Sequence, residues 1–131
     1  MLKIGAPVEI RRVFEVDGAE SEVAFLVCPP TRSTLKAARA AQEEGEEAFE
    51  AFWGPERVAQ HVVDWRGVAD ADGNPLPVSK EALEAVREDC PPLYNAAVAA
   101  IFESLPRKRE ADRKNSRPSP GGTSAPAGEG A

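Results

Sequence analysis

The chain has 131 residues, which fits one domain, and 42% of them are hydrophobic while 29% are charged. No apolar run approaches the roughly 18 residues that a membrane-spanning helix needs, and the first residues lack the apolar run of a secretion signal. These features exclude a membrane protein and favour a cytoplasmic one. The 12 Pro and 10 Gly exceed what a compact fold of this size needs, so part of the chain must be loop or tail.

Charge is unevenly distributed along the chain. Residues 1–106 contain 10 Lys and Arg against 19 Asp and Glu, whereas residues 107–117 contain six Lys and Arg against two Asp and Glu. The acidic segment repels phosphate backbones, and the basic one is too short and too mixed to bind nucleic acid alone. The pattern therefore favours a basic or apolar protein partner and argues against nucleic acid.

The first predicted element is a β-hairpin between residues 8 and 28. β-branched and aromatic residues dominate both arms, and Asp17-Gly18 between them is a strong signal for a hairpin turn. The alternation of apolar and polar residues is imperfect at Arg11-Arg12-Val13, which predicts a β-bulge there. Because an isolated hairpin is marginal in water, we expect helices to cover one of its faces.

An Ala-rich helix is predicted after the hairpin. Hydroxyl side chains in residues 31–34 can cap its first turn, and the helix should run to about Glu44. Gly45 then breaks or kinks the helix.

Large aromatic residues gather in the middle of the chain. Residues 46–53 are predicted to form a turn or two of helix that ends at Gly54-Pro55, and Pro55 suits the first position of a short helix through Val58 and Val62. The candidate partner-binding residues are Phe49, Phe52, Trp53 and Trp65. Aromatic residues near turns either seal a small core or anchor an interface, and for the two tryptophans the core is the favoured interpretation.

Two further helices are predicted after a turn-rich segment over residues 69–78. Ser79 is a good N-cap for a helix over residues 80–89. Pro91-Pro92 begins the last helix, because apolar residues there fall on one stripe and Pro106 closes the pattern. The stripe consists of Tyr94, Val98, Ile101 and Leu105, with Phe102 beside it.

The end of the chain differs from the rest in composition. No large apolar residue appears from Arg107 onward, so residues 107–131 have nothing to bury against the entropy of ordering them. We therefore predict an α+β fold in which an N-terminal β-hairpin packs on a small set of α-helices. This single domain covers residues 1–106, and a basic and then Pro/Gly/Ser-rich disordered tail covers residues 107–131.

Few residues offer catalytic chemistry. His61 is the single histidine, and Cys28 and Cys90 are the two cysteines. Sequence distance leaves a Cys–His nucleophile pair open, and with it a small enzyme or a metal-dependent regulator. Phosphate-binding Gly-rich loops and serine-nucleophile motifs are absent. We therefore expect a protein that is not an enzyme, with no catalytic residue, no metal site and no cofactor.

Residues 70–81 reproduce the ligand spacing of a calcium-binding EF-hand loop. The matching oxygen ligands are Asp70, Asp72, Asn74 and Glu81. However, Pro75 occupies the sixth position, where a flexible glycine makes the sharp turn of such loops. The favoured interpretation is an Asp-Gly turn followed by a capped helix.

Residues 62–83 carry the most distinctive motif of the chain. Its sequence is Val62-Val63-Asp64-Trp65-Arg66-Gly67-Val68-x-Asp70-x-Asp72-Gly73-Asn74-Pro75-Leu76-Pro77-Val78-Ser79-x-Glu81-x-Leu83. This motif resembles the central signature of the tail assembly chaperones encoded in siphophage and prophage tail gene clusters. The likeness extends to the order of elements over about residues 8–116. The signature residues are Trp65, Gly67, Asp72, Gly73, Pro75, Ser79 and Glu81.

The resemblance implies a protein that binds the tape measure protein, keeps its long apolar helices soluble and helps to recruit tail tube subunits. Its partners would be the tape measure protein and the tail tube protein, with self-association left open. It would act in the host cytoplasm and be absent from the mature virion. The alternatives are a virion structural protein, such as a head-tail connector or tail completion factor, and the Cys/His enzyme or metal-dependent regulator.

Overall fold

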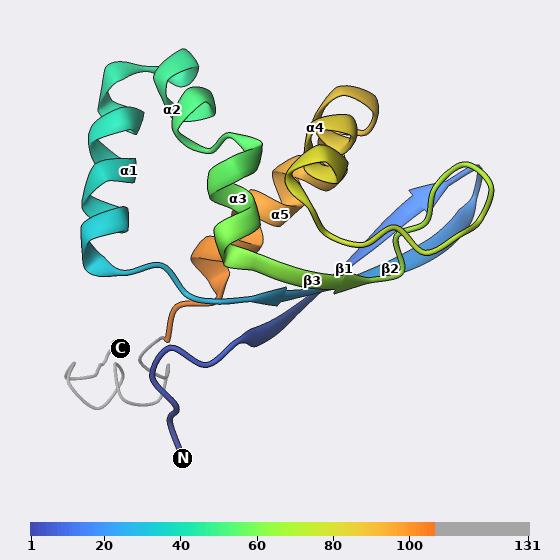
Figure 1. The fold of residues 1–131 in the computed structure, drawn as a ribbon, viewed down its shortest axis with the longest axis horizontal. Coiled ribbons are helices and arrows are strands. Elements are labelled where there is room, and N and C mark those ends of the chain that lie inside the picture. The colour runs from blue at the N-terminus through green and yellow to red at the C-terminus, as the bar shows by residue number, and fades with distance from the viewer. Residues whose placement is uncertain (107–131) are drawn as a thin grey trace, which may run out of the picture.

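The computed structural model describes residues 1–106, and the tail predicted over residues 107–131 lies outside the described residues. The elements in chain order are β1 (Val8–Val16), β2 (Ala19–Val27), α1 (Arg32–Glu44), α2 (Glu46–Phe52), α3 (Pro55–His61), β3 (Val62–Arg66), α4 (Lys80–Asp89) and α5 (Pro91–Glu103). The strands form one antiparallel sheet in the order β1-β2-β3, and the helices gather on one side of it (Figure 1). The predicted α+β class, with an N-terminal hairpin packed on helices, is confirmed.

The hairpin of β1 and β2 forms as predicted. The register runs from Val8 opposite Val27 to Val16 opposite Ala19, next to the turn. Asp17 and Gly18 have positive φ angles of 52° and 80°. Positive φ at both central residues is the requirement of the two-residue turn whose twist matches the flanking strands.

The predicted bulge at Arg11-Arg12-Val13 is wrong. The register between β1 and β2 has no shift there, and the irregularity of the sheet lies instead between Leu26 and Val27, where β2 pairs with β3. Arg12 occupies a position that faces the helices, and its guanidinium forms an ion pair with Glu103 at the end of α5. A charged residue is thus accommodated on the helix side by an ion pair, without an extra residue in the strand.

The predicted helix starts and the break at Gly45 agree with the structure. The Thr31 hydroxyl accepts a hydrogen bond from the backbone N–H of Thr34 at 3.2 Å, and the Ser79 hydroxyl accepts one from Ala82 at 3.0 Å. Gly45 has a φ of 129° and separates α1 from α2. Side-chain caps of this kind satisfy N–H groups that have no partner inside the helix.

The third strand, β3, departs from the sequence prediction. The short helix after Pro55 ends at His61 rather than continuing through Val62. Residues Val62–Arg66 pair with β2 in antiparallel register, with Trp65 opposite Phe25. Two adjacent β-branched valines favour the extended conformation, and the open edge of β2 supplies hydrogen-bonding partners.

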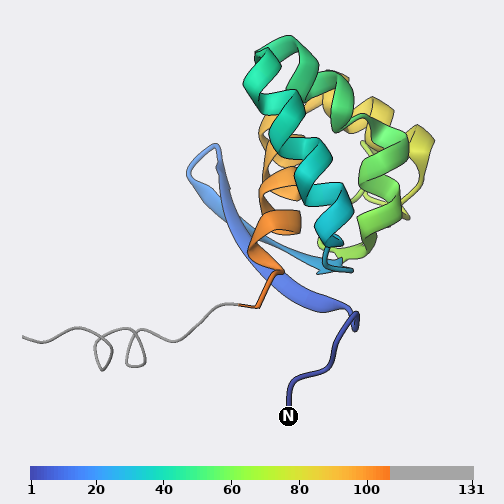
Figure 2. The same cartoon turned by 90° about the vertical axis from the view of Figure 1, so that its left-hand side faces the viewer.

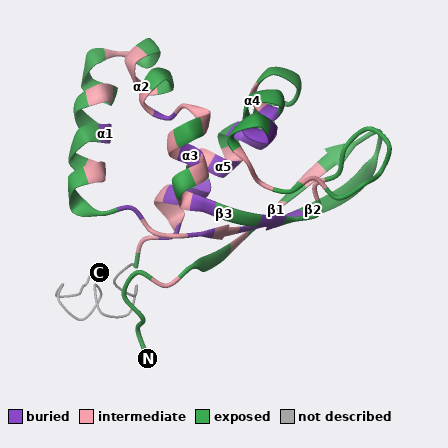
Figure 3. Ribbon diagram, viewed as in Figure 1, coloured by how far each residue is buried: buried purple, intermediate pink, exposed green. Residues whose placement is uncertain are grey.

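The core lies between the sheet and the helices (Figure 3). Its largest fully buried side chains are Trp53, Phe25, Leu83, Ile101, Val27, Val58 and Val62. In β2 the buried residues Val23, Phe25 and Val27 alternate with more exposed ones, as expected for a sheet with one covered face. No helix within residues 1–106 has the length and apolar character needed to cross a membrane.

The last helix buries only part of the predicted stripe, since Tyr94 and Ile101 are buried as predicted. Its buried residues are Leu93, Tyr94, Ala97, Ala100 and Ile101. Val98 is only half-buried, and Leu105 lies beyond Glu103, where the helix ends. Small alanines let α5 approach its neighbours closely, which leaves the larger Val98 and Phe102 on the side that faces α2.

Candidate functional site

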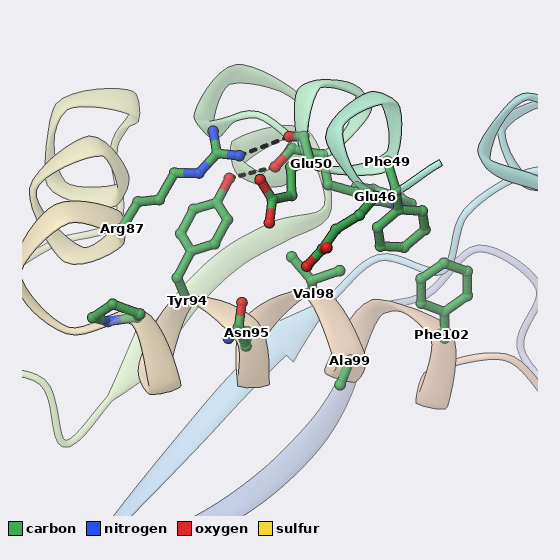
Figure 4. Close-up of a pocket in the computed structure, with 11 residues that line it drawn as sticks. Glu46, Phe49, Glu50, Arg87, Tyr94, Asn95, Val98, Ala99 and Phe102 are labelled. Carbon is green, nitrogen blue, oxygen red and sulfur yellow. Dashed lines mark hydrogen bonds between the residues drawn. The ribbon is translucent and has the colours of Figure 1, made fainter. Parts of the chain in front are cut away.

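An open pocket of about 630 Å³ lies between α2 and α5 (Figure 4). Its apolar lining consists of Phe49, Trp53, Pro91, Tyr94, Val98, Ala99 and Phe102, and its polar lining consists of Glu46, Glu50, Arg87 and Asn95. We call this hollow the α2–α5 pocket. Figure 4 shows the carboxylate side chains of Glu46 and Glu50 reaching from α2 toward α5.

Trp53 anchors the aromatic part of the pocket. Its side chain is only 1% exposed, and its ring makes edge-to-face contacts with Phe52, His61 and Phe102 at centroid distances of 5.1, 5.8 and 5.5 Å. Such pairs have a preferred geometry and add to the stabilisation that burial gives. The indole N–H of Trp53 has no acceptor within residues 1–106, but it is covered by protein atoms and no ligand could reach it without movement.

Two hydrogen bonds to backbone carbonyls tie α2 to the helices on the other side of the pocket. The Tyr94 hydroxyl donates to the carbonyl of Trp53 at 2.5 Å, and the Arg87 guanidinium donates to the carbonyl of Glu50 at 2.7 Å. Both acceptors lie at the end of α2, where carbonyl groups lack partners inside the helix. The Arg87 guanidinium also lies 5.1 Å from the centre of the Tyr94 ring.

The ionisation of Tyr94 is consistent with this donor role. Burial raises the pKa of the Tyr94 hydroxyl above its ordinary value, and the positive charge of Arg87 only partly opposes that effect. Tyr94 therefore keeps its proton at physiological pH and continues to donate to α2.

The pocket is lined by two carboxylates, those of Glu46 and Glu50, and by the guanidinium of Arg87. Among residues 1–106, neither Glu46 nor Glu50 takes part in an ion pair. Arg87 is the cation that lines the pocket, and its hydrogen bond goes to a backbone carbonyl. The pocket thus combines apolar side chains with two carboxylates that form no ion pair among the described residues. This combination suits a partner segment whose apolar side chains enter the pocket and whose flanking Lys or Arg residues face the carboxylates.

Only two of the four predicted partner-binding residues belong to the lining of this pocket. Phe49 and Trp53 line the α2–α5 pocket. Phe52 is half-buried with the Arg57 guanidinium 3.9 Å from its ring centre, and it lines a different hollow. Trp65 is 6% exposed and lies in β3. Both tryptophans therefore belong to the core, as the sequence favoured.

The pocket also uses residues that sequence reasoning did not select. These are Glu46, Glu50, Arg87, Pro91, Tyr94, Asn95, Val98, Ala99 and Phe102. One feature of the sequence could have indicated them, because the last helix has large apolar residues on more than one of its faces. A helix that is apolar over more than its core stripe has a second face to cover.

The glycines and tryptophan of the signature have structural roles. Gly67 has a φ of 91°, and a Cβ atom placed on it would lie 2.3 Å from the backbone oxygen of Glu22 in β2. Gly73 has a φ of 86° in the turn. The Trp65 indole N–H donates to the carbonyl of Leu76 at 2.5 Å, which fastens the returning arm of the turn to β3.

The remaining signature residues shape the same turn and the helix after it. One carboxylate oxygen of Asp70 accepts hydrogen bonds from the backbone N–H groups of Asp72 and Asn74, at 3.0 and 2.9 Å. Pro75 forms a short β-bridge with Ala69. Ser79 caps α4, and Glu81 lies in its first turn, near the positive end of the helix dipole. The Asp70 oxygen that an EF-hand would offer to calcium is thus used by the turn itself.

His61 and Cys28 are neighbours through their backbones. The Cys28 N–H donates to the His61 carbonyl at 2.8 Å. The His61 ring donates from Nδ1 to the carbonyl of Arg57 at 3.1 Å, and no hydrogen bond within residues 1–106 joins the ring to the Cys28 thiol. Cys90 is exposed between α4 and α5, and both thiols are free. Nowhere in the part of the chain that the structure describes do three His, Cys, Asp or Glu residues cluster as metal ligands would.

Comparisons with protein-family models, with curated proteins and with solved structures found no match to this chain. Its function therefore has to be inferred from its sequence and from the geometry of the α2–α5 pocket.

Proposed function

We propose that this protein is a phage tail assembly chaperone whose α2–α5 pocket binds apolar helical segments of the tape measure protein. The observation that carries the proposal is the aromatic floor of that pocket beside the two free carboxylates of Glu46 and Glu50. The resemblance of residues 62–83 to the chaperone signature supplies the identity of the partner. In this proposal the protein binds and releases its partner without catalysis or cofactor.

The pocket has room and an apolar lining for side chains that an amphipathic helix would insert. Such a helix docks through apolar side chains spaced three, four and seven residues apart, laid into a groove. A volume of about 630 Å³ falls within the roughly 300–1,000 Å³ of common ligand pockets. Phe49 and Phe102 line the pocket from α2 and α5, so an incoming side chain contacts aromatic rings from both helices.

The acidic character of the chain fits the task of keeping an apolar partner dissolved. Residues 1–106 contain 19 acidic against 10 basic side chains, and a large net charge opposes aggregation of the complex. Lys or Arg residues beside the apolar stripe of the partner would meet Glu46 and Glu50, which orients the helix and speeds its capture. The complex would form in the host cytoplasm, recruit tail tube subunits and release the protein before the virion is complete.

The decisive experiment is co-expression of this protein with the tape measure protein of the same tail gene cluster. Ala99 is exposed on α5 and lines the pocket, so Ala99→Glu should fill the pocket with a charged side chain while leaving the core intact. We expect this change to weaken binding at least about tenfold, equivalent to ~1.4 kcal/mol, and to leave the tape measure protein insoluble.

The matched control is Ala85→Glu, because Ala85 is an exposed alanine on α4 that does not line the pocket. This variant should bind and solubilise the tape measure protein as the parent chain does. Equal loss in both variants, or no binding by the parent chain, would contradict the proposal. Purified virions provide a further check by mass spectrometry, because stoichiometric recovery of the chain from them would favour the virion structural protein instead.

A further inference from the structure

We propose that the open edge of β1 binds a second copy of this chain. In the resulting dimer the two β1 strands pair antiparallel, and the two-fold axis passes beside Val13. This inference rests on the sheet alone and does not depend on the identity of the tape measure protein as a partner.

The open edge is the first observation. Within residues 1–106, β1 pairs with β2 on one side only, and Figure 2 shows it running along the outside of the sheet. Edge strands offer unpaired N–H and C=O groups to any extended chain, and proteins usually protect them with charged side chains, Pro, a bulge or a short length. The charges of β1 are of both signs, so they can complement those of a second copy rather than repel it. β1 has nine residues, an uninterrupted register, and neither Pro nor Lys.

Exposed valines are the second observation. Val13 is 59% exposed and Val16 is 61% exposed, both on this edge strand. Val13 lies on the face away from the helices, because the residues on either side of it, Arg12 and Phe14, are half-buried toward them. Apolar surface removed from water contributes about 25 cal/mol per Å², so two facing valines would stabilise a contact.

Charge favours a register in which Val13 of one copy faces Val13 of the other. In an antiparallel pair, every second residue of a strand is hydrogen-bonded to its partner strand, beginning with the two residues that flank a two-residue turn. Val16 and Ala19 flank this turn, so the even-numbered residues of β1 bond to β2 and the odd-numbered ones direct their N–H and C=O groups away from it. When Val13 faces Val13 of the second copy, Arg11 falls opposite Glu15 of the second copy. The two-fold axis repeats that pair, so two favourable cross-strand charge pairs flank the central valines.

The register centred on Arg12 is unfavourable. Centring the pair on Arg12 would place two Arg12 side chains together and bring Glu9 opposite Glu15, and like charges directly opposite are destabilising. In the register centred on Val13, Glu9 instead comes opposite Asp17 near the hairpin turn. Glu9 keeps its ion pair with Arg66 in that register. In the single chain, hydrogen bonds from Arg11 and Arg66 hold the pKa of the Glu9 carboxyl below its ordinary value.

A charge-swap series on the full-length chain tests the dimer, with sedimentation velocity over a range of concentrations as the measurement. We expect the parent chain to be dimeric, and both Arg11→Glu and Glu15→Arg to raise its dissociation constant at least about tenfold. The double variant Arg11→Glu/Glu15→Arg should recover most of the affinity, because it exchanges the signs of both cross-strand pairs. Circular dichroism of each variant checks that the fold is kept. A parent chain that stays monomeric at the highest concentration, or a dimer that both reversals leave unchanged, would overturn the proposal.

Cross-linking tests the register independently. In a background with Cys28→Ser and Cys90→Ser, Val13→Cys would place two thiols opposite each other, at a Cα separation of about 5.5 Å that a disulfide can span. We expect a covalent dimer under mild oxidation. Val16→Cys is the matched control, because Val16 is equally exposed and would lie opposite Ile10 of the second copy. Cross-linking of Val16→Cys but not Val13→Cys would exclude the proposed register, and cross-linking of neither would contradict β1 pairing.

Discussion

Gly67 shows how a single residue of the signature acts through the fold. A side chain there would meet two obstacles, a positive φ of 91° and the backbone oxygen of Glu22 at 2.3 Å from the added Cβ. That oxygen belongs to β2, so the glycine permits the chain leaving β3 to pass directly beside the neighbouring strand. The signature therefore encodes a close approach between two segments that are distant in sequence, which gives a physical reason for a glycine at this point.

Replacement of Gly67 by alanine should consequently cost more stability than replacement of Gly73. Gly73 has a similar φ of 86° but nothing within 4 Å of an added Cβ, so Gly73→Ala measures the backbone strain alone. We expect strain of about 1–3 kcal/mol in both variants, with a further loss in Gly67→Ala because β2 must move. Chemical denaturation of the two variants measures the difference. Equal losses of stability in the two variants would show that the close approach to Glu22 adds nothing to the cost of a side chain at position 67.

Trp65 offers a second test at the same scale, since its two contributions can be separated. Trp65→Ala removes a nearly buried aromatic side chain, and such changes cost about 3–5 kcal/mol. Trp65→Phe keeps most of the packing and removes the hydrogen bond to the Leu76 carbonyl, so its cost should be nearer ~1 kcal/mol. Thermal melts of the two variants give the comparison. If Trp65→Ala melted like the parent chain, the place of Trp65 in the core would be in error.

At the scale of elements, the sequence predicted correctly those features that depend on residues adjacent in the chain. The turn at Asp17-Gly18, the caps at Thr31 and Ser79, and the break at Gly45 follow from preferences of a few adjacent residues. Strand β3 could not be predicted in the same way, because the conformation of Val62–Arg66 depends on the open edge of β2, distant in sequence. The bulge near Arg12 was predicted wrongly for a related reason, since the ion pair with Glu103 is a long-range contact.

The candidate site illustrates the same limit. The aromatic residues Phe49 and Trp53 could be selected from their spacing, and both line the α2–α5 pocket. Their partners on α5 could not, because helical periodicity gives the faces of a helix but not the angle at which its neighbour packs. Alanines at positions 97 and 100 bring α5 close to the core and so turn Val98 and Phe102 toward α2.

At the scale of the whole molecule, the described residues form a complete hydrophobic core. Every element from β1 to α5 contacts another, and the last buried side chains of the core are Ala100 and Ile101. Ser104 closes α5, where its hydroxyl donates to the carbonyl of Ile101 at 2.6 Å. Burial of apolar surface is the main favourable contribution to folding, so we expect residues 1–106 to fold without the residues that follow.

Removal of residues 107–131 should therefore leave the fold intact while changing its charge. A chain ending at Pro106 keeps all 16 buried apolar residues of the core, and we expect its melting temperature to stay within about 4 °C of the parent value, a difference of roughly 1 kcal/mol or less. Its isoelectric point should fall, because residues 107–117 contain six basic and only two acidic side chains. Calorimetry and isoelectric focusing measure the two effects.

A chain cut at Leu93, inside α5, is the control that should fail to fold, because Tyr94, Ala97, Ala100 and Ile101 would be lost from the core. Unfolding of the chain that ends at Pro106 would place the domain boundary further along the sequence.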